Sequence, residues 1–241
     1  MPYQLEVIAF NIECCKKIEK AGAQRIELCA NPLEGGTTPS YGFIKTARQK
    51  VSIQLFPIIR PRGGDFFYTA DEFAIIKNDV IFCKEAGCDG VVIGILNADG
   101  SVDKKRCQVL VDMAYPMEVT FHRAFDRAAD PFKALEDIIE VGCSRILTSG
   151  QQATAMQGIT LLENLVKKAD ERIIIMLGSG VRSTNIIELA VQTGAVEFHT
   201  SARMLAPSKM DFVSGSIDAT SKTIIVDENE VEKMVLLLQS R

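Results

Sequence analysis

The chain has 241 residues, of which 47% are hydrophobic, and a formal net charge of −4, so it can fill the core of one large domain. Its basic residues are scattered rather than clustered, which argues against general nucleic-acid binding. No apolar run approaches the roughly 20 residues of a membrane-spanning helix. The first residues, MPYQLEVIAF, have no basic region ahead of the apolar stretch, so we expect no signal peptide. Seven cysteines without C-x-x-C spacing indicate reduced thiols and a cytoplasmic protein.

Strand and helix patterns alternate without a break along the chain. Eight short apolar segments are typical of strands, namely 5–10, 25–29, 53–60, 90–95, 118–123, 145–149, 173–177 and 197–201. Helices are expected at 11–21, 40–50, 69–87, 103–114, 130–142, 154–169, 183–194 and 228–239. Thr69 and Glu72 form a capping box, and Asp130 precedes a proline at the first helical position. The polar stretch 206–222 is expected to be a lid, an interface or a mobile loop.

A repeat supports this count of strands. GAQRIEL, GCDGVVI, GCSRILT and GAVEFHT each place a glycine at a helix end, then a short turn and an apolar strand, and each precedes an even-numbered strand. Eight strand–helix units in this length predict a single α/β domain over 1–241, a closed (β/α)8 barrel of eight parallel strands. A doubly wound open sheet is the alternative. Polar residues recur in nearly all eight strands, which disfavours uniformly apolar central strands and hence the open sheet.

The two histidines of the chain, His122 and His199, stand at the ends of the fifth and eighth predicted strands, each directly after a phenylalanine. Active sites of (β/α)8 barrels lie at the carboxyl ends of the strands. Side chains alternate along a strand, so phenylalanines facing the helices would turn both imidazoles toward the barrel axis. The same alternation turns further residues inward, namely Glu6, Arg25, Glu27, Cys29, Arg60, Glu197 and Ser201. We therefore predict catalytic roles for Glu27, His122 and His199.

Structural roles compete with this hypothesis. Arg25 and Glu197 come early on their strands and could form a buried ion network with Glu6 and Glu27. A histidine in a core is often a satisfied structural residue, and Cys29 could be an inert small hydrophobe. The other six cysteines fall on helices or helix ends and are expected to be structural.

Three glycine-rich loops, at 34–40, 60–68 and 178–183, predict close approach of the backbone to a ligand. Loops after the seventh and eighth strands of such barrels often bind phosphate. We predict that polar residues at these strand ends and loops bind a small anionic substrate, namely Glu6, Arg60, Arg62, Asp65, Arg123, Ser179, Arg182, Ser201 and Arg203. Tight turns with surface arginines, or arginines paired with Asp65, are the alternative.

Seven segments together make the chain resemble one known family, the copper homeostasis protein CutC family, along nearly its whole length. They are LEV (5–7), GAQRIELC (22–29), EGGTTPS (34–40), IRPRGGDFFYT (59–69), VTFHRAFD (119–126), RILTSG (145–150) and EFHTSAR (197–203). The resemblance implies a cytoplasmic TIM barrel that forms homo-oligomers and is linked by name to copper tolerance and copper(I) binding. It also implies a pair of cysteine ligands, of which Cys29 matches one while Ile8 stands at the position of the other.

Two functions follow as rival hypotheses. The first is copper handling, with Cys29 as the soft ligand of copper(I), alone or with His199 or His122. The second is an enzyme acting on a small phosphorylated or carboxylated metabolite, with a histidine and Glu27 as acid and base. A divalent metal held by Glu6, Glu27 and the histidines is a variant of the second, and a non-catalytic oligomeric scaffold is a third possibility.

Overall fold

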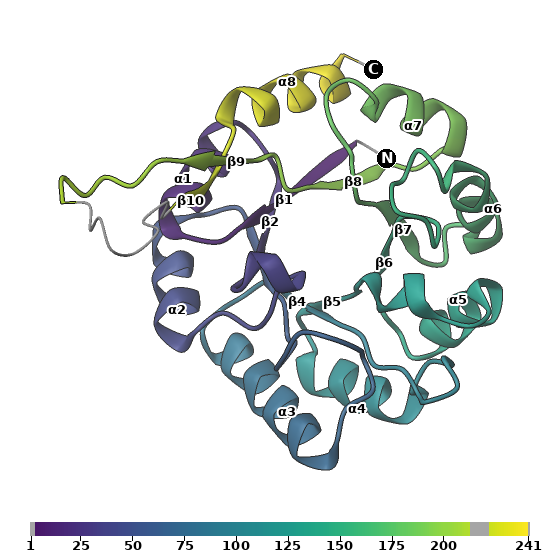
Figure 1. Ribbon diagram of the computed structural model, residues 1–241. Helices are drawn as coiled ribbons and strands as arrows, with labels where there is room; N and C mark the ends of the chain where they lie inside the picture. The colour runs from purple at the N-terminus through teal and green to yellow at the C-terminus, as the bar shows by residue number, and fades with distance from the viewer. Residues whose placement is uncertain (1–2, 213–221, 241) are drawn as a thin grey trace.

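The computed structural model describes residues 3–212 and 222–240, and within them eight parallel strands form a central barrel with helices around it (Figure 1). The strands are β1 Gln4–Ala9, β2 Arg25–Leu28, β3 Gln54–Pro57, β4 Gly90–Ile93, β5 Glu118–Phe121, β6 Arg145–Thr148, β7 Ile174–Leu177 and β8 Glu197–Thr200. The α-helices are α1 Ile12–Lys20, α2 Tyr41–Lys50, α3 Ala70–Glu85, α4 Lys104–Ala114, α5 Pro131–Glu140, α6 Ile159–Ala169, α7 Ile186–Thr193 and α8 Glu228–Gln239.

The order of the strands decides between a barrel and an open sheet. The sheet runs β3-β2-β1-β8-β7-β6-β5-β4, so the first strand pairs with the eighth. Its two ends meet through a parallel bridge between Ile58 and Val92, and the Ile59 N–H donates to the Val92 carbonyl at 2.8 Å. The predicted (β/α)8 barrel is confirmed, and the doubly wound alternative is wrong.

The glycines of the repeat end helices in the left-handed conformation. Gly22, Gly87, Gly142 and Gly194 have φ values between +75° and +86°, a region that residues with a Cβ adopt at a cost. Each glycine turns the chain from a helix back toward the start of the next even-numbered strand. The repeat therefore sets the spacing of the barrel units.

Two helices begin later than the sequence predicted. Residues 154–158 form a turn in which the Thr154 carbonyl accepts hydrogen bonds from the Gln157 and Gly158 N–H groups, so α6 starts only at Ile159. Before α7, the Asn185 side chain accepts a hydrogen bond from the Arg182 N–H, and the helix starts at Ile186. The predicted capping box of α3 is present, with both of its hydrogen bonds.

The core has an outer and an inner part. Apolar side chains from the strands pack against the helices in one continuous layer that includes Phe121 and Phe198. Inside the barrel, a small separate cluster holds Cys29, Phe56, Ile58 and Val92. The phenylalanines before the two histidines thus pack in the outer layer, as predicted.

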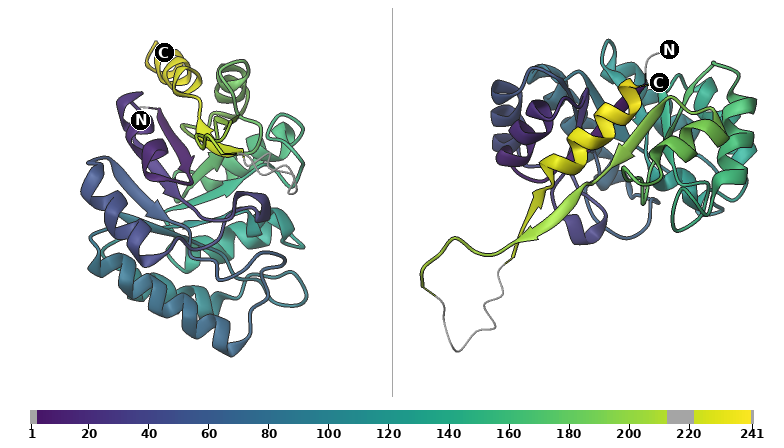
Figure 2. Two further views of the ribbon diagram at one scale, coloured as in Figure 1. Left: turned by 60° about the vertical axis from the view of Figure 1, so that its left-hand side comes forward. Right: turned by 90° about the horizontal axis from the view of Figure 1, so that it is seen from above.

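A two-stranded hairpin, which we call the arm, leaves the barrel between β8 and α8 (Figure 2). Its strands β9 Arg203–Ala206 and β10 Thr223–Val226 pair antiparallel. Neither strand was expected, although the apolar run TIIV at 223–226 was a signal. Residues 213–221 of the predicted polar stretch lie outside the described residues. No helix in ranges 3–212 and 222–240 is long and apolar enough to cross a membrane.

Candidate active site

A buried ion network lies inside the barrel, near the amino-terminal ends of the strands. Arg25 lies between two carboxylates. Its Nε is 2.5 Å from Glu6 Oε2, and its Nη2 pairs with Glu197 Oε2. Arg145 Nε lies 3.1 Å from the same Glu197 oxygen. Both guanidinium groups stand 5.2 Å from the centroid of the Phe56 ring. Arg25 and Glu197 therefore adopt the structural role that the sequence left open for them.

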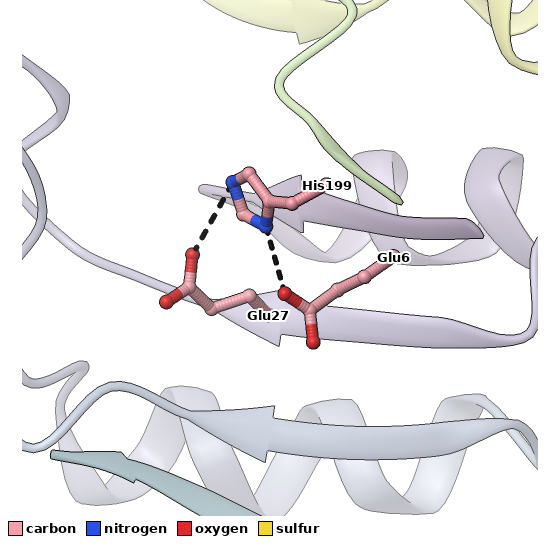
Figure 3. A group of neighbouring side chains, drawn as sticks. All are labelled: Glu6, Glu27 and His199. Carbon is pink, nitrogen blue, oxygen red and sulfur yellow. Dashed lines mark hydrogen bonds and ion pairs between the residues drawn. The ribbon is translucent and has the colours of Figure 1, made fainter. Parts of the chain in front are cut away.

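Glu6, His199 and Glu27 form a row with the imidazole in the middle, and Glu6 joins this row to the ion network through Arg25 (Figure 3). Parallel strand pairing brings them together. Glu6 on β1 is in register with His199 on β8, and Ile8, two residues further along β1, is in register with Glu27 on β2. His199 Nδ1 lies 2.7 Å from Glu6 Oε1, and His199 Nε2 lies 3.7 Å from Glu27 Oε2. The imidazole thus stands between two carboxyl groups that contact different ring nitrogens.

The environment gives the two carboxyl groups opposite properties. Burial alone would raise the pKa of Glu6, but the charge of Arg25 and the hydrogen bond with His199 lower it to about 2. Burial raises the pKa of Glu27 to about 7, since the opposing charge of His199 offsets only part of the desolvation. For His199, burial lowers the pKa, but the bond with Glu6 and the charge of Glu27 outweigh it, so the pKa is raised. Glu6 therefore stays ionised and orients the imidazole, while the carboxyl group of Glu27 titrates near neutral pH on the other side of the ring.

His122 differs from His199 in its hydrogen bonds and in the direction of its pKa shift. Its Nδ1 accepts a hydrogen bond of 3.1 Å from the Ala124 N–H, so the ring proton of the neutral imidazole is on Nε2. Burial and the charge of Arg60 lower the pKa of His122 to about 3. The ring packs against Phe66, with centroids 4.9 Å apart. This imidazole remains neutral and presents an N–H donor.

A cavity of about 100 Å³ opens between these side chains at the carboxyl ends of the strands. Its wall includes five of the predicted site residues, Glu27, Arg60, His122, Arg123 and His199. Glu6 lies behind His199. The other predicted site residues are not among those that form its wall, namely Cys29, Arg62, Asp65, Ser179, Arg182, Ser201 and Arg203.

The arginines of the RPR motif already have partners within the protein. Arg60 donates to the carbonyl oxygens of Glu34, Gly36 and Gly64 over 2.7–2.9 Å and so holds two glycine-rich loops together. Arg62 pairs with Glu72 at 2.5 Å and with Asp65 at 3.0 Å. These contacts match the alternative in which Asp65 pairs with an arginine. Substrate binding by Arg62 and Asp65 stays a prediction.

Arg123 is the half-exposed cation of the cavity wall. Arg123 Nε lies 2.7 Å from Asp126 Oδ2, and a second nitrogen of Arg123 donates a hydrogen bond to Ser149 Oγ at 2.9 Å. On the loop after β7, Ser179 Oγ donates to the Ala153 carbonyl at 2.7 Å. Arg203 is exposed on the arm. The predicted anion site after β7 and β8 is thus separate from the cavity, and its role stays a prediction.

Sequence reasoning missed three residues that shape the cavity. Phe66 packs against two residues of the cavity wall, because its ring contacts the neutral imidazole of His122 and the Arg60 guanidinium carbon is 4.9 Å from its centroid. Gly94 leaves room for the His122 ring, since a Cβ there would overlap Nδ1 and Cε1. Leu147 closes the wall. The signal for Gly94 was a glycine within the fourth strand pattern, which marks a close approach.

The comparisons with known proteins agree with one another. The model of the CutC family matches residues 3–204. This chain belongs to the CutC family. A CutC family protein of Parabacteroides distasonis is 51% identical over 91% of each chain, and one of Bacteroides thetaiotaomicron is 49% identical over 95% of this chain and 92% of its own. The crystal structure of a protein from Streptococcus agalactiae, described as a copper homeostasis protein CutC, is 34% identical with a TM-score of 0.78, covering 82% of this chain and 97% of that one. Phosphoribosylanthranilate isomerase of Thermotoga maritima, 9% identical with a TM-score of 0.61 over 99% of this chain and 100% of its own, shares the fold alone.

The family name directs attention to copper, but the residues of this CutC protein are poor ligands for copper(I). Copper(I) prefers thiolate and thioether ligands. Cys29 is fully buried among Phe56, Ile58 and Val92. Burial and the negative charge of Glu27 raise the pKa of its thiol well above the usual value, which disfavours the thiolate. Ile8, at the position where the family resemblance predicts a second cysteine, has no ligand atom. This donor set does not fit a copper(I) site.

A harder cation fits the row of residues better. Ligand atoms of Glu6, Glu27 and His199 lie within 4.8 Å of one another, and they form the one such group of His, Cys, Asp and Glu found in the described part of the chain. Both Glu6 oxygens are already paired, one with Arg25 and one with His199. Only Glu27 and His199 Nε2 remain free to face the cavity. The divalent-metal variant therefore has two protein ligands at most.

Proposed function

We propose that this CutC protein is an enzyme that moves a proton within a small anionic metabolite bound at the barrel mouth. One observation carries the proposal: a buried carboxyl group with a pKa near neutrality faces a small cavity beside an oriented histidine. Groups with a pKa near the working pH are effective general acids and bases. Perturbed carboxyl groups also cluster at functional sites.

Each residue has a role in this proposal. Glu27 takes a proton from the ligand and returns it. His199 shares that proton through Nε2, and Glu6 holds the imidazole in place through Nδ1. Arg123, fixed by Asp126 at the rim, attracts the carboxylate or phosphate of the metabolite.

The test is exchange of carbon-bound hydrogen with solvent. The protein is incubated in D₂O with a panel of small carboxylated and phosphorylated metabolites, and deuterium incorporation is measured by mass spectrometry. Parallel incubations with EDTA and with Mn²⁺ report whether a divalent metal takes part. We expect one chemical class of metabolite to gain deuterium. The proposal is contradicted if the whole panel remains unlabelled, or if labelling persists unchanged in Glu27→Gln.

Copper handling is the rival function, and a titration separates the two. In an anaerobic competitive titration, we expect weak copper(I) binding that is equal in the wild type and in Cys29→Ser, because one protonated buried thiol offers a poor ligand. Cys107→Ser is the matched control, since Cys107 is an equally buried thiol on α4. A tight stoichiometric site that disappears only in Cys29→Ser would establish copper(I) as a ligand and return the family name to first place.

We also propose that the protein is cytoplasmic and self-associates. The cytoplasmic location is supported by seven free, buried cysteines. Self-association is supported by the arm. An isolated two-stranded hairpin is marginally stable, and this one carries exposed apolar side chains at Met204, Leu205, Met210 and Phe212.

The arm provides a direct test of self-association. We expect the wild type to have a molar mass above that of one chain in light scattering, and Leu205→Glu combined with Phe212→Glu to lower it. Val191→Glu, at an exposed apolar residue on α7, is the matched control and should leave the mass unchanged. A monomeric wild type, or an oligomer indifferent to the arm substitutions, would count against the proposal.

A further inference from the structure

His122 Nε2 is a buried hydrogen-bond donor with no acceptor among the described residues. The residue is 4% exposed and forms part of the cavity wall. Leaving such a group unpaired is destabilising, so the fold keeps it there at the expense of stability. A ligand atom, or a water in its absence, is the natural acceptor.

Three neighbours hold this donor in one orientation, and a fourth supplies a positive charge. The Ala124 N–H fixes Nδ1 as an acceptor at 3.1 Å, which leaves the proton on Nε2. Phe66 packs on the ring, and Gly94 provides the space in which the ring lies. Arg60 adds a positive charge nearby, held by three loop carbonyls. The donor is therefore preorganised, with a fixed cation beside it.

We propose that His122 Nε2–H donates a hydrogen bond to the carbonyl oxygen of the substrate as negative charge develops on that oxygen. The positive charge of Arg60 stabilises the same oxygen. The substrate class is then a small anionic aldehyde, ketone or 2-oxo acid with a hydrogen on the carbon next to the carbonyl. This inference rests on the proposed function, since Glu27 and His199 stand on the wall of the same cavity. It names what that site acts on.

The reaction step balances without a further reactant. Glu27 forms an O–H bond with the proton of the adjacent carbon as the C–H bond breaks. The C–H electron pair becomes the new C=C bond, and the carbonyl π pair moves to oxygen, giving an enolate. His122 donates a hydrogen bond to that oxygen and keeps its proton, since a neutral imidazole is a weak acid. The proton on Glu27 then exchanges with solvent, and transfer of a solvent-derived proton to the enolate carbon restores the carbonyl compound with no change of oxidation state.

The experiment uses acetohydroxamate, a planar analogue of an enediolate, with acetamide as the control lacking the second oxygen. The chain has only two histidines, so ¹⁵N-labelled imidazoles can be assigned from His122→Phe and His199→Gln. We expect the His122 Nε2–H resonance to move downfield with acetohydroxamate and not with acetamide. Binding should weaken at least about tenfold in His122→Phe, as expected for a lost hydrogen bond to a charged group. The wild-type spectrum remains decisive if that variant fails to fold.

The outcomes separate this inference from the proposed function. If acetohydroxamate leaves the His122 resonance in place, or does not bind, the inference is overturned, while Glu27-dependent deuterium exchange would still support the proposed function. If the His122 resonance moves but the metabolite panel shows no exchange, an oxyanion site at His122 is supported and the proposed acid–base function is contradicted.

Discussion

Replacing Glu27 by glutamine is expected to slow deuterium exchange by about 10²–10⁴-fold, the range that a general acid or base contributes. The amide cannot accept the proton, yet it keeps the size of the carboxyl group and its place 3.7 Å from His199 Nε2. Binding of the metabolite should change much less than the rate. Glu13→Gln, on the exposed first turn of α1, is the matched control and should exchange at the wild-type rate.

The pH profile gives the same experiment a second readout. Because the pKa of Glu27 is raised to about 7, the base form is the minority below that pH. The exchange rate of the wild type at low substrate concentration should rise about tenfold per pH unit up to neutrality and then level off. A flat profile between pH 5 and pH 8 would remove Glu27 from the role of base.

The folding stability of the wild type should fall over the pH range in which its exchange rate rises. Its pKa is 4.5 ordinarily and about 7 in the folded protein. The folded state therefore binds this proton more tightly, and the resulting stabilisation is full below pH 4.5 and lost as the pH rises through 7. Relative to the wild type, Glu27→Gln should be more stable at pH 8 than at pH 5 in urea denaturation. If Glu27→Gln loses deuterium exchange but gains relative stability at pH 8, unfolding of the variant is excluded as the cause of the lost exchange.

The barrel could be predicted because its signals are local. Glycine at the helix ends and apolar strands after them recur in four places, and the eight strand–helix units of which they are part leave few ways to close a sheet. The alternation of side chains was also sufficient to turn Arg25, Glu27 and His199 inward, since strand geometry allows only two faces. The arm escaped prediction because β9 and β10 pair only with each other and lie outside the eight strand–helix units, although the Ile224 carbonyl of β10 accepts a hydrogen bond from Asn11 Nδ2 at 3.0 Å.

The different roles of His122 and His199 could not be predicted from the sequence. Both stand at strand ends after phenylalanine, but His199 is in register with Glu6, whereas His122 meets the Ala124 N–H and the charge of Arg60. Those partners depend on register and loop path. The loop arginines illustrate the same limit, because Arg60 and Arg123 line the cavity only after contacts with backbone and Asp126 have fixed them.

Arg25→Met is expected to destabilise the protein by about 3–5 kcal/mol, the usual cost of removing one partner from a buried ion pair. Glu6 and Glu197 would then face each other in the barrel with one cation fewer. Arg172→Met is the matched control. Arg172 makes a bidentate pair with Glu136 at 2.7 and 2.9 Å, but both side chains are over 40% exposed, so its loss should cost less than about 1 kcal/mol. Equal losses in urea denaturation would contradict the assignment of a buried network.

Two further measurements separate charge from packing in Arg25→Met. The pKa of Glu6, about 2 in the folded protein and 4.5 ordinarily, means that its stabilising contribution is present above pH 4.5 and is lost as the pH falls toward 2. The stability gap between the wild type and Arg25→Met should therefore narrow from pH 7 to pH 3. Adding Glu197→Gln should recover part of the loss, since it removes one of the two buried carboxylates that lose Arg25 as a partner. A gap that stays constant with pH and is not relieved by the second substitution would mean that Arg25 acts through its packing on Phe56 rather than through its charge.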